Sequence, residues 1–355
     1  MESTIINWMA AITSPIPISS QHLRPLNIVR DLPGVADLVE KCFANTMDAE
    51  GRNYIQQMRR AGQDNAFLRW ASTAVETVSM PLSGYVWEEN GEIIGNVSLI
   101  PYRHSRKKYY LIANVAVRLE ERRRGIGRSL TIAAMQHARQ RHAFETWLHV
   151  RADNPGAIEL YRSLGFIELA RRTTWQASPD PNISPDVSAT SITSRAIRDW
   201  STQEAWLHRL YPDLMAWYQP MPWLPLRPGP GPMLYRFLID VTIRHWVARS
   251  GSSCSAVLSW QAMANKNDLL WAAVPPDGGE ASLTALLLHA RRALALRQKL
   301  TLDFPAGKYD GSMETSGFQR YRTLLWMRSD ETLGEKTVHP NEIMHNRSTN
   351  RRSLK

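Results

Sequence analysis

Residues 114–130 join an apolar segment to an amphipathic helix through a connector rich in arginine and glycine. Val117 ends the apolar segment, and Arg122, Gly125 and Gly127 follow before the helix. The first turn of a helix has backbone amides without intrahelical partners, at the positive end of the helix dipole. Glycines let a ligand approach the backbone closely, and arginine adds a permanent positive charge. The segment therefore predicts a strand, a diphosphate-binding loop and a helix in direct succession.

The glycine spacing excludes two common phosphate-binding motifs. Leu130 stands where the dinucleotide fingerprint needs its third glycine. No Gly-Lys-Ser/Thr sequence follows, so the loop is not a P-loop. A basic cluster surrounds the loop and is either a solvated face or a pocket for a polyphosphate, and the glycines favour the pocket. Its members are Arg103, Arg106, Lys107, Lys108, Arg118, Arg122, Arg123, Arg124 and Arg128.

A second motif follows in residues 149–166. An apolar strand ends before Asn154, and a helix then places Tyr161 four residues before a Gly-Phe step. Together the two segments resemble the acetyl-CoA site of the GNAT superfamily of N-acetyltransferases, and they are similar to its ribosomal-protein N-terminal acetyltransferase type. The resemblance covers residues 26–175 and is strongest over 110–166.

The resemblance implies a sheet that opens between the strand ending at Val117 and the next strand of the first half. Acetyl-CoA would be the acyl donor, with its pantetheine arm in the opening, and no metal is implied. A backbone N–H near Val117 would stabilise charge on the thioester oxygen. The implied cofactor-binding residues are Val115, Ala116, Val117, Arg122, Arg123, Arg124, Gly125, Ile126, Gly127, Arg128, Ser129, Asn154 and Tyr161.

Two side chains are candidates for proton transfer. Tyr161 would be the general acid for the departing thiolate, and the alternative is an aromatic packing residue on its helix. The ribosomal-protein type has a glutamate twelve positions before this tyrosine, and His149 stands there. An imidazole can accept a proton near neutral pH, so His149 is the candidate base. A structural role for His149, a base at His104, Glu88 or Glu89, or deprotonation into solvent are the alternatives.

Asn154 has two compatible roles. The resemblance implies that it tethers the pantetheine arm. The Asn-Pro-Gly sequence that it begins is also a favourable helix start, with Asn154 as the N-cap.

Apolar periodicity and turn signals predict the elements of the first half. We expect strands at 26–29, 85–87, 93–100, 109–117, 146–150 and 167–175 and helices at 33–43, 52–74, 125–141 and 155–164.

The second half repeats this order in divergent form. Ser129-Leu130-Thr131 is echoed by Ser282-Leu283-Thr284, and Gly165-Phe166 by Gly317-Phe318. An internal duplication is the interpretation, and an unrelated α/β domain is the alternative. Helices are expected at 195–215, 234–249 and 282–296, and strands at 256–260, 269–274, 300–304 and 323–327.

The second half lacks the features of the phosphate loop. Its loop at 274–282 has no arginine and contains Asp277 and Glu280, which would repel phosphate. Met313 and Ala306 stand near the positions of Tyr161 and Asn154. We therefore expect a degenerate partner that shapes the substrate site, with the loop 218–232, which includes Trp223, as a candidate for lining a shared cleft.

The expected fold is α+β, with two tandem GNAT-like domains built on a mixed, mostly antiparallel sheet flanked by helices. The expected division is an N-terminal extension at 1–25, a catalytic domain at 26–176, a linker at 177–191, a degenerate domain at 192–329 and a basic tail at 330–355.

Composition narrows the class of protein. The chain has 355 residues and is 43% hydrophobic, which is enough for two buried cores. No segment has about 18 consecutive apolar residues, so no membrane span is expected. Only Cys42 and Cys254 occur, which favours core roles and a reducing cytoplasm. The net charge of +10 fits an anionic ligand, and the absence of a stacking motif or recognition helix disfavours nucleic acid.

The functional hypothesis is an acetyl-CoA-dependent N-acetyltransferase. Its acceptor would be a primary amine on a small molecule or a protein. The alternative is a non-catalytic acyl-CoA-binding regulatory protein.

Overall fold

The computed structural model describes residues 21–47, 49–64, 81–184, 191–218, 220–264 and 267–330. Most of the expected N-terminal extension and basic tail, and residues 65–74 of the expected helix at 52–74, lie outside these ranges. In the described residues, no helix is both long and apolar enough to cross a bilayer. The same residues contain no cluster of three or more His, Cys, Asp and Glu side chains suited to a metal ion.

The first half alternates strands and helices in the order that its periodicity predicts. Its strands are β1 (Leu23–Pro25), β2 (Ser83–Glu89), β3 (Glu92–His104), β4 (Lys107–Val117), β5 (Glu145–Arg151) and β6 (Phe166–Ala177). Its helices are α2 (Ile28–Phe43), α3 (Ala49–Ala61), α5 (Ile126–Gln140) and α6 (Pro155–Ser163), with a 3-10 turn at Leu119–Glu121.

The second half has the same order of strands, and this order agrees with the duplication. Its strands are β7 (Ser191–Ser194), β8 (Ile243–Ser250), β9 (Ser253–Gln261), β10 (Asp268–Ala273), β11 (Leu300–Pro305) and β12 (Gln319–Ser329). Its helices are α7 (Trp200–Leu210), α8 (Trp223–Leu226), α9 (Pro230–Leu238), α10 (Glu280–Ala293) and α11 (Asp310–Thr315), with 3-10 turns at Ile197–Asp199 and Asp213–Met215. Helices α7, α8 and α9 lie between its first two strands.

All these strands form one sheet, in the order β1-β2-β3-β4-β5-β12-β6-β11-β10-β9-β8-β7. Only β4–β5 and β10–β11 pair in parallel, and the other neighbours are antiparallel. Each parallel pair is joined by a crossover helix, α5 or α10, as parallel strands require. The expected mixed, mostly antiparallel sheet is confirmed.

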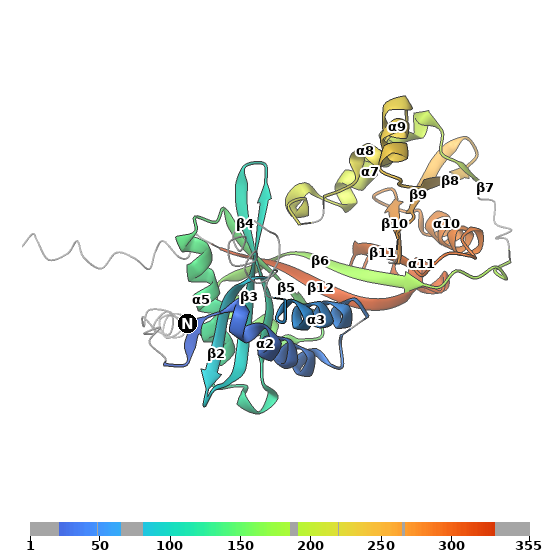
Figure 1. Ribbon diagram of the computed structural model, residues 1–355. Coiled ribbons are helices and arrows are strands. Elements are labelled where there is room, and N and C mark those ends of the chain that lie inside the picture. Colours follow the sequence, from blue (N-terminus) through green and yellow to red (C-terminus); the bar gives the residue numbers. More distant parts are fainter. Residues whose placement is uncertain are drawn as a thin grey trace, which may run out of the picture.

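The two halves exchange their closing strands. β12 lies between β5 and β6, and β6 lies between β12 and β11. Figure 1 shows both long strands running between the halves. At their centre Thr173 pairs with Thr323, and the two hydroxyls are 2.9 Å apart. The sheet is therefore continuous across the boundary between the sequence repeats.

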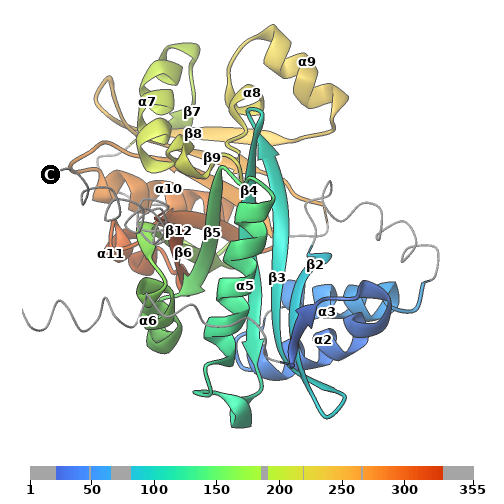
Figure 2. The same cartoon turned by 90° about the vertical axis from the view of Figure 1, so that its left-hand side faces the viewer.

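Helices cover both faces of the sheet in each half. Strand side chains alternate between faces, so Ile94 packs under α5 and α6 while its neighbour Ile93 packs under α2 and α3. Figure 2 shows α5 lying across β3, β4 and β5. In the second half Trp260 lies in the core with α10, and Trp271 lies in the opposite core with α7 and α8.

Four expected elements differ from the structure. The expected helix at 52–74 ends at Ala61, and a turn follows at residues 62–63. Residues 26–29 are not a strand, because Asn27 caps α2 by accepting hydrogen bonds from the amides of Val29 and Arg30. The expected helix at 195–215 is shorter, because α7 ends before Pro212. The expected helix at 234–249 ends at Leu238, and the rest is β8, whose alternating buried side chains pair with β7 and β9.

Candidate active site

The sheet opens between β4 and β5. The two strands pair at four positions, from Tyr109 with Glu145 to Ile112 with Leu148, and then separate. Just beyond the last pair, Asn114 has φ +50° and forms a bulge opposite β3. A bulge bends its strand and ends regular pairing, which accounts for the separation. The expected opening beside Val117 is thus present.

The α5 helix begins beside this opening. Gly125 caps α5 in the left-handed conformation, with φ +81°, and its carbonyl accepts from the amide of Ser129 at 3.0 Å. A Cβ at Gly125 would have no other atom within 4 Å, so the turn is open. A Cβ at Gly127 would lie 3.7 Å from both Val117 and Leu160. The first turn of α5 therefore lies beside the end of β4 and beside α6.

The arginines of the loop have different partners. Arg124 is held in ion pairs with Glu121 and, at 2.9 Å, with Glu89. Arg122 donates to the carbonyl of Val117 at 3.1 Å, and Arg128 donates to the Ser163 hydroxyl on α6 at 2.9 Å.

Arg123 is exposed, and it makes no ion pair with any residue that the structure describes. The loop thus keeps exposed guanidinium groups beside the first turn of α5, whereas the Arg124 side chain is committed to carboxylates.

Tyr161 lies on α6, on the α5 side of the sheet. It is 7% exposed and packs with Phe166, with ring centroids 6.0 Å apart. Burial raises the pKa of its phenol far above the usual value, so the hydroxyl stays protonated. Within the described parts of the chain, that hydroxyl has no hydrogen-bond partner.

His149 is the first residue of β5 beyond the last pair with β4. Leu148 and Val150 belong to the core under α5 and α6, so His149 faces the other side of the sheet. Its ring centroid lies 5.0 Å from that of Trp326 and 6.4 Å from that of Tyr218. Burial, with a smaller effect of the Arg322 cation, lowers the pKa of His149 to about 4.

Asn154 is the N-cap of α6. Its side-chain oxygen accepts from the amide of Ala157 at 3.2 Å. The other base candidates are less suited: Glu88 pairs with Arg24 and Glu89 with Arg124, and His104 is exposed at the end of β3.

The second half has a similar opening between β10 and β11, but the loop before α10 differs from the loop before α5. β10 and β11 pair in parallel as far as Leu270 with Leu302, so Asp303 takes the place of His149. Gly279 caps α10 with φ +94°, as Gly125 caps α5. Here, however, the Tyr309 hydroxyl bonds to the carbonyls of Pro275 and Gly278, at 3.0 and 2.6 Å, across the loop.

Asp303 also differs from His149 in its neighbours. It forms an ion pair with the buried Arg172, and burial nevertheless raises the pKa of its carboxyl.

Comparison with known proteins agrees with this geometry. Residues 48–166 match the family described as "Acetyltransferase (GNAT) family". The chain contains a GNAT acetyltransferase domain. The "[Ribosomal protein bS18]-alanine N-acetyltransferase" of Escherichia coli K12 is 39% identical over 67 residues, which is 19% of this chain and 45% of that enzyme. The "Mycothiol acetyltransferase" of Corynebacterium kroppenstedtii is 28% identical over 138 residues, 34% of each chain.

The GNAT fold extends through both halves. A GCN5-related N-acetyltransferase from Sphaerobacter thermophilus superposes with a TM-score of 0.51 at 12% identity. The match covers 87% of this chain and 96% of that protein. This likeness concerns the fold alone.

Sequence reasoning missed part of the site. Trp326 pairs with His149 only because β12 is exchanged into the first half, and the strand pattern carries no signal for that pairing. Tyr218 belongs to the loop expected to line a shared cleft, and it contacts both His149 and Trp326. Trp223 of the same loop instead stacks on His208, with ring centroids 4.1 Å apart.

Proposed function

We propose that this protein is an N-acetyltransferase that transfers the acetyl group of acetyl-CoA to a primary amine. The observation that supports this most strongly is the coincidence of two features: an open, glycine-capped helix mouth at Gly125, and a β4–β5 opening that begins beside it. The diphosphate would bind at the first turn of α5, and the pantetheine arm attached to it would enter the opening beside that turn.

The donor would bind through the backbone of three consecutive segments. The amides of Gly125, Ile126, Gly127 and Arg128 lie at the start of α5, where an anion is stabilised, and Ser129 would add its side-chain hydroxyl. Arg122 and Arg123 add exposed positive charge, and Arg124 positions the loop through its ion pairs. The pantetheine arm would pair with Val115, Ala116 and Val117 on β4, with Asn154 on the other side of the opening.

Acetyl-CoA supplies the thioester; the amine nitrogen forms a bond to its carbonyl carbon, and the bond from carbon to sulfur breaks. Tyr161 would donate its hydroxyl proton to the departing sulfur, and its raised pKa suits an acid that must stay protonated. His149 would accept the proton from the amine, and its lowered pKa keeps it neutral at physiological pH. A base with a pKa of about 4 is weak, so transfer through water to solvent would assist it.

The second half would not bind acetyl-CoA. Asp277 and Glu280 lie at its helix mouth, and Tyr309 bridges the loop carbonyls there. Its role would be to complete the sheet through β12 and to shape the acceptor side. The division at residues 26–176 and 192–329 would then describe the repeats, while the folded unit is the whole sheet.

A screen for acetylated products tests the proposal. Purified protein would be incubated with acetyl-CoA and a mixed amine library, and products would be identified by mass spectrometry. We expect a gain of one acetyl group on at least one amine, together with release of CoA thiol. Binding of acetyl-CoA without any product would instead indicate a regulatory acyl-CoA-binding protein.

A further inference from the structure

We propose that the acceptor is a primary amine attached to an aromatic ring system, and that aromatic side chains of the second half recognise that ring. This inference rests on the proposed function, since it concerns the acceptor side of the same opening. It follows from three observations: the position of the rings, the charges around them, and the origin of each ring in the chain.

The rings surround His149 at the point where β4 and β5 separate. The rings of His149, Tyr218 and Trp326 are mutually in contact, with Tyr218 and Trp326 centroids 4.8 Å apart. Tyr102 of β3 extends the group, 5.6 Å from Tyr218. We call Tyr102, His149, Tyr218 and Trp326 the aromatic wall. It lies on the face of the sheet opposite Tyr161, where an amine could approach a thioester held in the opening.

The wall is partly open to a ligand. Trp326 is only 5% exposed and forms the base of the wall, whereas Tyr102, His149 and Tyr218 are half-buried. Aromatic rings bind other rings in stacked or edge-to-face geometry, and each such contact contributes beyond simple burial of area. A flat apolar group is therefore the ligand that this surface fits.

The charges near the wall argue against a polycationic acceptor. After burial, the Arg322 cation contributes to the lowered pKa of His149, so a positive charge acts on the wall. A second positive charge on the acceptor would be repelled there, whereas a single amine next to ring faces is favoured by cation–π attraction. A monoamine with an aromatic body satisfies both conditions, and a polyamine does not.

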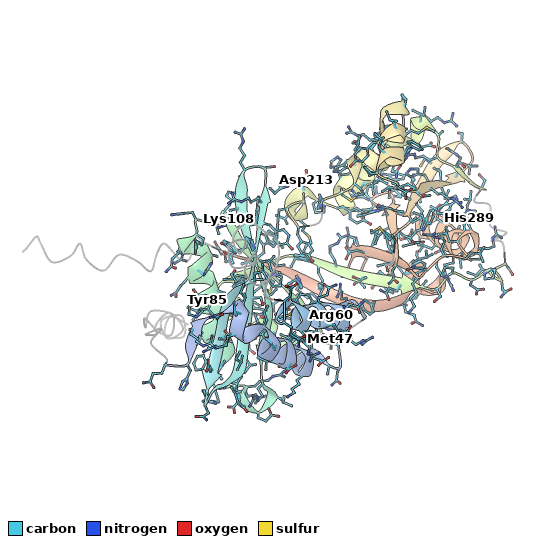
Figure 3. The ribbon with its side chains drawn as sticks, viewed as in Figure 1. Met47, Arg60, Tyr85, Lys108, Asp213 and His289 are labelled. Carbon is cyan, nitrogen blue, oxygen red and sulfur yellow. The ribbon has the colours of Figure 1, made fainter. Side chains whose placement is uncertain are left out.

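The second half supplies two of the four wall residues, Tyr218 and Trp326, from two separate segments. The exchanged strand β12 carries Trp326, and the loop after α7 carries Trp217 and Tyr218. In that loop Met215 and Trp217 pack on Tyr109 and Trp147 of the first half. Figure 3 labels Asp213 at the start of this loop, and Trp217 of the loop contacts Tyr102 of the β3–β4 hairpin, with ring centroids 5.3 Å apart. The degenerate half would thus determine acceptor specificity while the first half binds the donor.

Two measurements on the full chain test the inference. The first is kcat/KM with phenethylamine, n-hexylamine, spermidine and a short peptide beginning with alanine, at saturating acetyl-CoA. The second is isothermal titration of phenethylamine into protein saturated with CoA, which needs no turnover. We expect phenethylamine to exceed each other amine by about tenfold, which corresponds to one or two ring contacts.

Variants at Tyr218 link the preference to the wall. Tyr218→Phe keeps the ring, so its KM for phenethylamine should stay well below that of Tyr218→Leu. Tyr218→Leu removes it and should raise that KM about tenfold, with the KM for acetyl-CoA unchanged. Tyr235→Ala, at an exposed tyrosine on α9 of the same half, is the matched control and should change neither.

The outcomes separate this inference from the proposed function. If amines are acetylated but spermidine or the peptide equals phenethylamine, or if Tyr218→Leu leaves its KM unchanged, the aromatic acceptor is wrong and the acetyltransferase stands. If phenethylamine binds in the titration but no amine is acetylated, the recognition surface stands and the enzymatic proposal fails. If phenethylamine neither binds nor reacts, the inference fails.

Discussion

Burial moves the pKa values of Tyr161 and His149 in opposite directions, and both side chains therefore stay neutral at physiological pH. The phenol becomes a weaker acid and stays protonated, and the imidazole becomes a weaker base and stays neutral. Both effects come from the cost of placing a charge in a poorly solvated site. The two groups lie on opposite faces of the opening, which matches a leaving thiolate on one side and an arriving amine on the other.

Tyr161→Phe tests the acid. The change keeps the ring in the core with Phe166, so the fold and the affinity for CoA should be preserved. Without the proton donor, kcat should fall by about 10²–10⁴. Steady-state kinetics with the best amine from the screen, and titration with CoA, measure both quantities. An unchanged kcat would remove Tyr161 from the mechanism.

His149→Gln tests the half-buried imidazole through stability. The ordinary pKa is 6.5 and the folded value about 4, so between these pH values the unfolded chain binds more protons than the native protein. Stability must therefore rise with pH across this window and be lost as the pH falls from 6.5 towards 4. The variant removes this contribution, so its stability should fall less between pH 7 and pH 5 (about two units).

Urea unfolding at the two pH values measures the difference. His104→Gln, at an exposed histidine on the β3–β4 hairpin, is the control and should keep the wild-type pH dependence. Equal pH slopes for His149→Gln and the wild type would show that His149 is not buried in its neutral form.

At the scale of elements, the glycine-containing loops before α5 and α10 can be compared. Gly125 has φ +81°, and Gly278, which precedes the α10 cap residue Gly279, has φ +71°; a Cβ at Gly125 or Gly278 meets nothing within 4 Å. Alanine at each site should cost about 1–2 kcal/mol of backbone strain. Gly125→Ala should in addition weaken CoA binding about tenfold, because the turn that presents the amides shifts. Gly278→Ala should leave CoA binding unchanged.

Thermal unfolding and CoA titration of both variants measure the two effects. If Gly125→Ala and Gly278→Ala weaken CoA binding equally, or if neither variant weakens it, the first turn of α5 does not bind the diphosphate.

Most elements could be predicted from the sequence because their signals are local. The strand and helix around Gly125 follow from apolar spacing and glycine position, and α6 follows from Asn154-Pro155-Gly156. The first turn of α2 was missed because the capping role of Asn27 is not an apolar pattern. β8 was read as helix because Leu234 to Leu238 begin a helical pattern that Asp240, with φ +50°, ends.

The exchange of closing strands could not be predicted from the sequence. β6 and β12 each mix apolar and charged residues, and a strand pattern of this kind does not specify a neighbouring strand. The pairing of Trp326 with His149 joins positions that are far apart in the chain, and only the folded sheet determines it. The exchange and the loop after α7 bring the residues of the aromatic wall together. Local sequence patterns therefore could not predict which residues form it.

At the scale of the whole molecule, the exchange makes the two halves one folding unit. β12 covers the edge of β5, and it also pairs with β6 at ten positions. Arg172 of β6 forms a buried ion pair with Asp303 of β11, and it donates to the carbonyl of Leu210 at 2.9 Å. Neither half can complete its sheet alone, so a single cooperative transition is expected.

Deletion of residues 319–355 tests this claim. It removes β12 but no residue of the proposed donor site. We expect loss of CoA binding, because the edges of β5 and β6 become unpaired and the opening loses its far wall. Deletion of 331–355 alone is the control and should retain binding. A chain ending at residue 318 that binds CoA with wild-type affinity would contradict the account.

The central claim is that the mouth of α5 binds the diphosphate of acetyl-CoA and the β4–β5 opening receives its pantetheine arm. A crystal structure of the complex with acetyl-CoA tests it most directly. The account predicts diphosphate oxygens within hydrogen-bond distance of the amides from Gly125 to Arg128, and the thioester between Val117 and His149. A diphosphate bound elsewhere, with the first turn of α5 unoccupied, would contradict it.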